Sequence, residues 1–138
     1  MTRPEALRFR PVDLTDLHVL VVDDYEDTLE LFRSALQSFG AKVLTARTAR
    51  DALAIIKTVC VNAMVSDLAM PGEDGIWLVQ QLRGLKYEQG GSIPTIAVTA
   101  HRDRYAAEKV MGFGFEAFLT KPVDPFDLAR TVASLVGR

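Results

Sequence analysis

The sequence contains a single cysteine, Cys60, among its 138 residues. One cysteine excludes a disulfide within the chain, and it cannot supply a thiolate cage for a metal ion. Because Cys60 falls in an apolar helical pattern, we expect it to fill part of the hydrophobic core.

Long hydrophobic runs are also missing. No apolar segment of the sequence approaches the roughly 20 residues that a helix needs to cross a bilayer. The N-terminus lacks the apolar run of a secretory signal peptide. We therefore expect no membrane insertion and a cytoplasmic location.

Charge of neither sign is in large excess, since 16 basic and 18 acidic residues give a net charge of -2. A nucleic-acid-binding domain usually has a basic face, so we expect no direct nucleic acid binding. Hydrophobic residues make up 49% of the chain and charged residues 25%, which are ordinary values for a globular protein. The length fits one domain with a single core.

Five apolar runs alternate with helical patterns along the chain. The runs are continuous, which is typical of parallel strands buried on both faces. We predict strands at 18–22, 42–46, 63–65 leading to Asp67, 93–98 and within 113–119. Because most connections are short, this alternation predicts helices on both faces of a parallel sheet. The expected fold class is α/β, a single doubly wound five-stranded parallel sheet of the flavodoxin-like (βα)5 type with strand order 2-1-3-4-5.

One domain accounts for most of the chain. Residues 1–16 carry Pro4, Pro11 and three arginines but no sustained period, and we interpret them as an N-terminal tail or linker. Residues 17–138 form the predicted domain.

Two helices have clear start signals. Thr48 with Asp51 three residues later resembles a capping box, and the apolar face that follows extends to Val59. Asp124 as N-cap, with Pro125 at the first helical position, predicts the start of the last helix.

Polar residues that could bind a ligand or react with one follow the ends of the predicted strands. Asp23 and Asp24 follow the first strand, Asp67 ends the third, Thr99 follows the fourth and Lys121 follows the fifth. All carboxyl ends of a parallel sheet lie on one edge, and strands one and three are neighbours in the expected order. Three carboxylates would then share one pocket, where like charges destabilise the fold unless they are neutralised. Mg²⁺ is the natural partner because it prefers oxygen ligands.

This combination of groups suits phosphoryl transfer, which needs charge neutralisation and positioning more than proton transfer. Asp67 beside a metal ion can act as the nucleophile and form an acyl phosphate. Lys121 supplies a second positive charge, and the Thr99 hydroxyl can donate to an anion. Each residue taken singly also has an ordinary structural interpretation, as a helix cap, a turn residue or a solvated charge.

The chain from about His18 to Val136 resembles the receiver domains of two-component response regulators. The resemblance rests on the acidic pair after the first strand, Asp67 with Met70-Pro71 and Gly75, Thr99-Ala100, and Lys121-Pro122. The segment Met70 to Gly75 and the Gly90-Gly91 loop look most like the receivers of hybrid sensor histidine kinases.

The resemblance implies that Asp67 accepts a phosphoryl group from a phosphohistidine of a sensor histidine kinase or histidine phosphotransfer protein. It implies that Asp24, Asp67 and the backbone carbonyl of Ala69 ligate Mg²⁺ directly, while Asp23 acts partly through water. Lys121 would bridge to the phosphoryl oxygens.

The resemblance also implies a switch. Thr99 would move to bond the phosphate, and Phe118 would turn inward with it. The output surface would consist of the fourth helix, fifth strand and fifth helix, facing a downstream protein or an attached domain. A homodimer is also compatible with the resemblance. The residues that flank the site are Met70, Ala100, His101 and Pro122, and the bond before Pro122 is expected to be cis.

Three other functions are compatible with parts of the pattern. A flavodoxin-like cofactor module would need a glycine- and hydroxyl-rich loop after the first strand, where Asp23 and Asp24 would repel a phosphate. An aspartyl-nucleophile phosphatase of the haloacid dehalogenase type has a second Asp where Ala69 stands. A receiver-like interaction module that takes up no phosphate would not need Asp67 or Lys121. We therefore expect no enzyme beyond self-phosphorylation from phosphodonors and autodephosphorylation.

Overall fold

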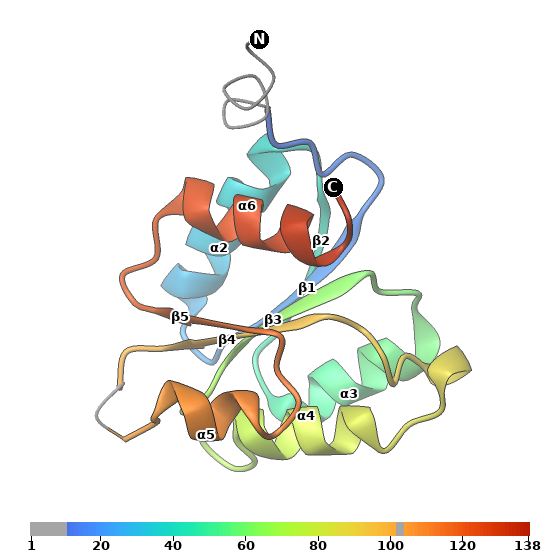
Figure 1. Cartoon of the computed structure of the whole chain (residues 1–138), viewed down its shortest axis with the longest axis vertical. Helices are drawn as coiled ribbons and strands as arrows, with labels where there is room; N and C mark the ends of the chain where they lie inside the picture. The colour runs from blue at the N-terminus through green and yellow to red at the C-terminus, as the bar shows by residue number, and fades with distance from the viewer. Residues whose placement is uncertain (1–10, 102–103) are drawn as a thin grey trace, which may run out of the picture.

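The structure is a computed structural model that describes residues 11–101 and 104–138. Strands and helices alternate along this part of the chain (Figure 1). The strands are β1 (His18–Val22), β2 (Lys42–Ala46), β3 (Ala63–Asp67), β4 (Thr95–Thr99) and β5 (Ala117–Thr120). The helices are α2 (Glu26–Ser38), α3 (Ala49–Thr58), α4 (Gly75–Arg83), the 3₁₀ turn η1 (Tyr87–Gln89), α5 (Ala107–Met111) and α6 (Pro125–Leu135). The fourth and fifth α-helices of the sequence prediction are α5 and α6.

The five strands form one parallel sheet in the order β2-β1-β3-β4-β5. This confirms the predicted fold class and strand order. Every residue of β3 and β4 is buried, whereas no residue of the edge strand β5 is fully buried. The continuous apolar runs therefore mark the strands that lie between two helical layers.

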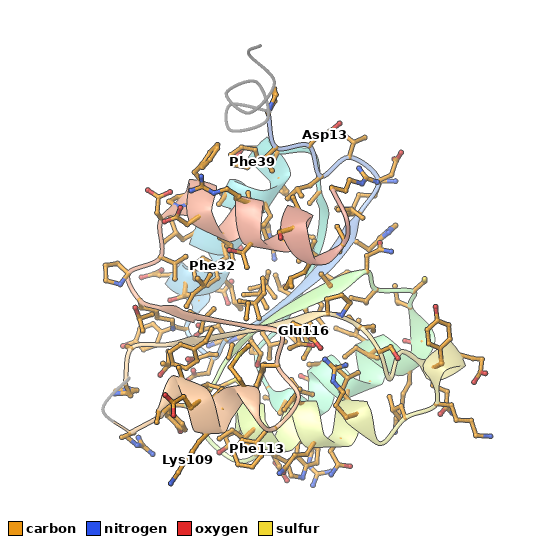
Figure 2. The ribbon with its side chains drawn as sticks, viewed as in Figure 1. Asp13, Phe32, Phe39, Lys109, Phe113 and Glu116 are labelled. Atoms are coloured by element: carbon orange, nitrogen blue, oxygen red, sulfur yellow. The ribbon has the colours of Figure 1, made fainter. Side chains whose placement is uncertain are left out.

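Helices cover both faces of the sheet, with α2 and α6 on one side and α3, α4 and α5 on the other (Figure 1). On the α2 side, Phe32 points toward the sheet and is 4% exposed (Figure 2). None of the helices in the described ranges has the length and apolar character that crossing a membrane requires.

Side-chain caps begin three of the helices. The Thr48 hydroxyl accepts a hydrogen bond from the Asp51 N–H at 3.1 Å, and Asp124 Oδ1 accepts from the Phe126 N–H at 2.8 Å. Both starts agree with the sequence prediction. Asp74 caps α4 in the same way, by accepting a hydrogen bond from the Trp77 N–H. Each of these side-chain oxygens satisfies an N–H group that has no partner within the first helical turn.

The end of α3 differs from the prediction. The helix stops at Thr58, and Val59 has extended backbone angles of φ -126° and ψ 139°. Val59 and Cys60 are both exposed, so the expected place of Cys60 in the core is wrong. The apolar pattern continues past the helix, but the chain there already turns toward β3 and no longer presents a helical inner face.

Part of the segment interpreted as a tail packs on the domain. Leu14 is fully buried in the cluster between α2, α6 and the sheet, and its N–H donates to the Phe39 carbonyl at 2.8 Å. Residues 1–10 lie outside the described residues, so the tail or linker stays a prediction for them.

Candidate functional site

The strand ends converge at one edge of the sheet because the strands are parallel and nearly level. In the register, Val22 of β1 pairs with Ser66 of β3, and Asp67 pairs with Val98 of β4. The residues that follow β1 therefore lie beside the end of β3. The sheet brings together Asp23, Asp24, Asp67, Thr99 and Lys121.

The three carboxyl groups form a compact cluster. Asp23, Asp24 and Asp67 each offer a carboxylate oxygen within 4.8 Å of those of the other two. Asp23 is 1% exposed and Asp67 7% exposed, while Asp24 is half-buried. Two of the acids are thus largely removed from water at a place where a third carboxylate reaches the surface.

Lys121 enters this cluster from the end of β5. Its ammonium group lies 2.8 Å from Asp23 Oδ2 and 3.7 Å from Asp67 Oδ1. The single positive charge of Lys121 therefore offsets only part of the negative charge of the three carboxylates.

Burial is the largest influence on the pKa of Asp67. Removal from water raises the pKa of Asp67 to about 6, and the negative charges of Asp23 and Asp24 act in the same direction. The Lys121 ammonium and the hydrogen bond from the Leu68 N–H oppose this rise of the pKa. The site therefore carries more negative charge than its own groups neutralise.

The cluster could hold a divalent metal ion. All its donors are hard carboxylate oxygens, the ligand type that Mg²⁺ prefers, and a few carboxylates suffice because Mg²⁺ keeps several waters. A bound cation would also offset the mutual repulsion of the three carboxylates. The donor set and the charge of the site fit the expected ion.

Thr99 is the last residue of β4 and is fully buried. Its hydroxyl oxygen accepts a hydrogen bond from the His101 N–H at 2.9 Å, and its carbonyl accepts from the Lys121 N–H at 2.8 Å. The second of these contacts links the ends of β4 and β5, so the backbone holds Lys121 beside Thr99.

The remaining predicted residues surround the cluster at different depths. Phe118 is half-buried and packs against a small core formed by Leu68, Val79, Ala97, Val110 and Phe115. Met70 is buried among core residues, Ala69 is half-buried, and Ala100, His101 and Pro122 are exposed. The Lys121-Pro122 peptide bond is cis, as expected.

The structure adds three residues that the candidate site set did not contain. The Ser66 hydroxyl donates to the Asp67 carbonyl at 2.9 Å. A Cβ at Gly75 would lie only 2.3 Å from that same carbonyl, so α4 approaches Asp67 as closely as glycine allows. Arg47 donates to the Asp24 carbonyl at 3.1 Å. Gly75 belongs to the motif noted in the sequence, whereas Ser66 and Arg47 gave no signal there.

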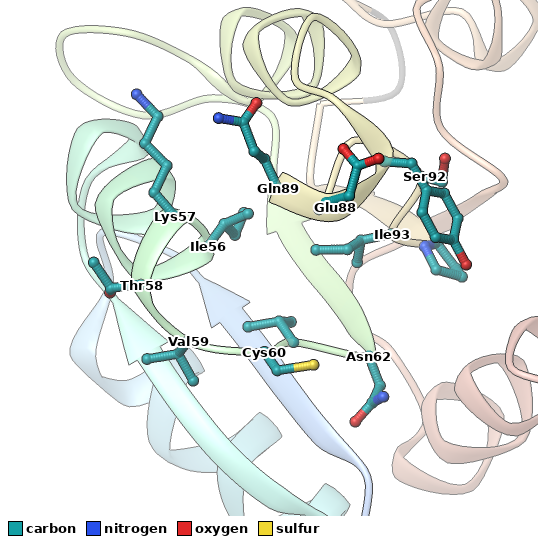
Figure 3. Close-up of a pocket in the computed structure, with 14 residues that line it drawn as sticks. Ile56, Lys57, Thr58, Val59, Cys60, Asn62, Glu88, Gln89, Ser92 and Ile93 are labelled. Atoms are coloured by element: carbon teal, nitrogen blue, oxygen red, sulfur yellow. The ribbon is translucent and has the colours of Figure 1, made fainter.

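Two hollows differ in their relation to this site. One of about 420 Å³ is lined by Ala69, Met70, Pro71, Gly72, Asp74, Arg104 and Tyr105, next to Asp67 in the chain. A larger one, of about 530 Å³, lies between the end of α3, η1 and the residues that precede β3 and β4 (Figure 3). These are the amino ends of the strands, so the larger hollow is on the edge opposite the acidic cluster.

Known proteins resemble this chain over most of its length. An uncharacterized 14.6 kDa protein of Leptolyngbya boryana is 40% identical over 119 residues, which are 86% of this chain and 89% of that protein. The sensor histidine kinase GacS of Pseudomonas protegens is 33% identical over 120 residues, 86% of this chain. The chain spans only 13% of GacS.

Solved structures agree with these relatives. The receiver domain of the Francisella response regulator 1452 superposes with a TM-score of 0.80 at 28% identity, covering 89% of this chain and 98% of that one. Residues 19–133 match the family described as response regulator receiver domain. With the strand order, the acidic edge and these similarities together, the chain belongs to the response regulator receiver domain family.

Proposed function

We propose that Asp67 is the phosphoacceptor of this receiver domain and that it takes the phosphoryl group from a phosphohistidine. The observation that carries the proposal is the position of the Asp67 carboxylate, clustered with Asp23 and Asp24 and 3.7 Å from the Lys121 ammonium. An anionic phosphoryl donor can approach such a cluster only where positive charge offsets the carboxylates.

In the transfer, an Asp67 carboxylate oxygen attacks the phosphorus atom and forms the acyl phosphate bond. The bond between phosphorus and the histidine nitrogen breaks, and its electron pair stays on the imidazole. Lys121 pairs with the phosphoryl oxygens, and the Thr99 hydroxyl donates a hydrogen bond to one of them. Water then hydrolyses the acyl phosphate, which releases inorganic phosphate and restores the Asp67 carboxylate, so the chemistry of the domain is limited to self-phosphorylation and autodephosphorylation.

Asp23, Asp24 and Asp67, with the backbone carbonyl of Ala69, would hold Mg²⁺. The ion supplies positive charge that offsets both the carboxylates and the incoming phosphate. Its place is supported by the oxygen-only donor set and by the presence of three clustered carboxylates beside one ammonium group.

Phosphorylation adds a charge of about -1.5 to -2 and new acceptor oxygens to the edge of the sheet. Thr99 reorients toward these oxygens, and Phe118 fills the space behind it. The half-buried state of Phe118 supports this coupling, because the ring already packs partly into the core between β5 and α5. The surface of α5, β5 and α6 then changes for a downstream protein or an attached domain.

The donor is a sensor histidine kinase or a histidine phosphotransfer protein on the cytoplasmic side of the membrane. The similarity to GacS supports this class of partner and a natural setting inside a larger sensor kinase, whereas the 14.6 kDa relative, which the chain matches over 89% of its length, supports a stand-alone protein.

The test is labelling with acetyl phosphate and Mg²⁺, followed by mass spectrometry to locate the added group. We expect the wild type to gain one phosphoryl group on Asp67 and Asp67→Asn to gain none. Asp51→Asn is the matched control, because Asp51 is an exposed acid on α3 outside the cluster, and it should label like the wild type. Labelling that persists in Asp67→Asn would overturn the assignment.

A further inference from the structure

The end of β2 contributes one more side chain to the acidic edge. Val22 of β1 pairs with Ala46 of β2, and the Asp23 N–H donates to the Ala46 carbonyl at 3.1 Å. This pairing places Arg47, the next residue after β2, at the level of Asp23, one residue before Asp24. The β1–α2 connection is therefore within reach of a side chain from the neighbouring strand.

Arg47 makes one contact with that connection and one with the first residue of α2. Its Nη2 donates to the Asp24 backbone carbonyl at 3.1 Å, and its Nε lies 3.7 Å from Glu26 Oε2. Asp24 lies between β1 and α2, outside both elements. The guanidinium thus connects the residue that carries one of the three clustered carboxylates to the end of β2 and to the first residue of α2.

We propose that Arg47 is a positioning residue for the metal site: by holding the backbone of Asp24, it fixes where the Asp24 carboxylate meets Asp23 and Asp67. This inference rests on the proposed function, because it assigns Arg47 a role in the Mg²⁺ affinity of the same cluster. Arg47 touches neither the phosphoryl group nor the metal in this role.

The charge of Arg47 and its hydrogen bond act on Mg²⁺ affinity in opposite directions. A guanidinium near a cation site repels the cation, so removing it would tighten Mg²⁺ binding if charge alone mattered. Loss of the hydrogen bond would release the Asp24 backbone and weaken binding. Arg47 is 62% exposed, and water and salt screen its charge strongly. The hydrogen bond depends on contact geometry, so we expect the positioning effect to exceed the charge effect.

The experiment compares the dissociation constant of Mg²⁺ in the full chain, its Arg47→Gln and Arg47→Lys variants, and a charge control, by NMR titration. Both Arg47 variants should bind Mg²⁺ about twofold to fivefold more weakly than the wild type, since an exposed hydrogen bond of a charged group has this order of effect. Arg47→Lys keeps the charge and loses the planar fork. Its weaker binding would therefore report geometry.

Arg50→Gln is the matched control. Arg50 is a second exposed arginine near the start of α3, but its guanidinium donates to Glu73 Oε1 at 3.0 and 2.6 Å and makes no contact with Asp24. Its loss should leave the Mg²⁺ affinity unchanged or slightly increase it.

A second measurement separates positioning from general stability. At saturating Mg²⁺ the acetyl phosphate labelling rate of both Arg47 variants should return to the wild-type value, because the defect lies in metal affinity. An Arg47→Gln variant that binds Mg²⁺ as tightly as the wild type or more tightly would overturn the inference, and so would a rate that stays low at saturation. A wild type that binds no Mg²⁺ would instead overturn the proposed metal site itself.

Discussion

The Lys121 ammonium lies 2.8 Å from Asp23 Oδ2 and 3.7 Å from Asp67 Oδ1. The lysine thus pairs most closely with the acid that is 1% exposed, and only secondarily with the proposed phosphoacceptor. Asp23 also accepts a hydrogen bond from the Tyr25 N–H at 2.9 Å, so both of its oxygens have partners. This arrangement makes the stability of the site depend on Lys121 as long as no other cation is bound.

Replacing Lys121 with methionine should reveal that dependence. Lys121→Met leaves two mostly buried carboxylates without their cation, and we expect a loss of about 1–3 kcal/mol in the free energy of unfolding in EDTA. Mg²⁺ should raise the free energy of unfolding more in the variant than in the wild type, because the bound ion is not repelled by the Lys121 ammonium in the variant. Chemical denaturation with and without Mg²⁺ measures both effects, and Lys109→Met, at an exposed site on α5, is the control. Equal Mg²⁺ effects in variant and wild type would contradict the prediction.

Mg²⁺ should stabilise the wild-type protein in proportion to its binding. A ligand that binds only the native state at ten times its dissociation constant adds about 1.4 kcal/mol. For a domain of this size, that corresponds to a rise of about 3–5 °C in the melting temperature. Asp24→Asn should show a smaller rise, since it removes one clustered carboxylate charge. Thermal melts in EDTA and in Mg²⁺ measure the difference. A wild-type melting temperature that does not change in millimolar Mg²⁺ would count against the metal site.

The sequence allowed the composition of the site to be predicted because a parallel sheet brings all carboxyl ends of its strands to one edge. Asp23, Asp67 and Lys121 could be placed together from the apolar runs before them. Which acid pairs with Lys121 could not be predicted from the sequence. The choice between Asp23 and Asp67 depends on how the lysine side chain extends from β5 past the ends of β4 and β3.

Element boundaries were harder to predict where apolar residues continue beyond an element. Val59 extends the apolar face of α3 in the sequence, yet the helix ends one residue earlier. The fifth strand was expected within 113–119, but Gly114 takes a φ of +119° in the turn and β5 begins at Ala117. In both cases the tertiary course of the chain, and not the local pattern, decides where the boundary of the element lies.

Gly75 should be among the least replaceable residues near the site. In Gly75→Ala the new Cβ would lie 2.3 Å from the Asp67 carbonyl oxygen and 3.0 Å from the Leu68 Cα, so α4 or the end of β3 must shift. We expect a loss of about 2–3 kcal/mol in the free energy of unfolding and slower labelling by acetyl phosphate.

The control for Gly75→Ala is an alanine at the other end of the same helix. At Gly84, φ is -77° and a Cβ would meet no atom closer than 3.4 Å. Gly84→Ala should therefore change stability by less than about 1 kcal/mol in either direction and leave labelling unchanged. Chemical denaturation of both variants tests the contrast, and equal stabilities would contradict the close approach of α4 to Asp67.

Arg83, the last residue of α4, forms a network of hydrogen bonds away from the acidic edge. Its guanidinium donates to the carbonyls of Gly91 and Ile93 at 2.9 Å, and to that of Gly114 at 3.0 and 2.8 Å. It also lies 2.7 Å from Glu116 Oε1. Figure 2 shows Glu116, the residue before β5. These partners come from two loops that only the tertiary structure brings together.

Arg83→Met should therefore destabilise the protein although it is remote from the acidic edge. The substitution removes one side chain and leaves several carbonyls without a donor, so we expect a loss of about 2–4 kcal/mol in the free energy of unfolding. Arg130→Met is the matched control, because Arg130 is 58% exposed and its contacts, an ion pair with Asp127 and a position 4.7 Å over the exposed Phe126 ring, contribute little to stability. Arg83→Lys should fall between the wild type and Arg83→Met, since one ammonium cannot reach both loops in the way the planar fork does. Urea denaturation measures all three variants. If Arg83→Met unfolds at the same urea concentration as Arg130→Met, the two loops are held by their own backbone turns and not by the arginine.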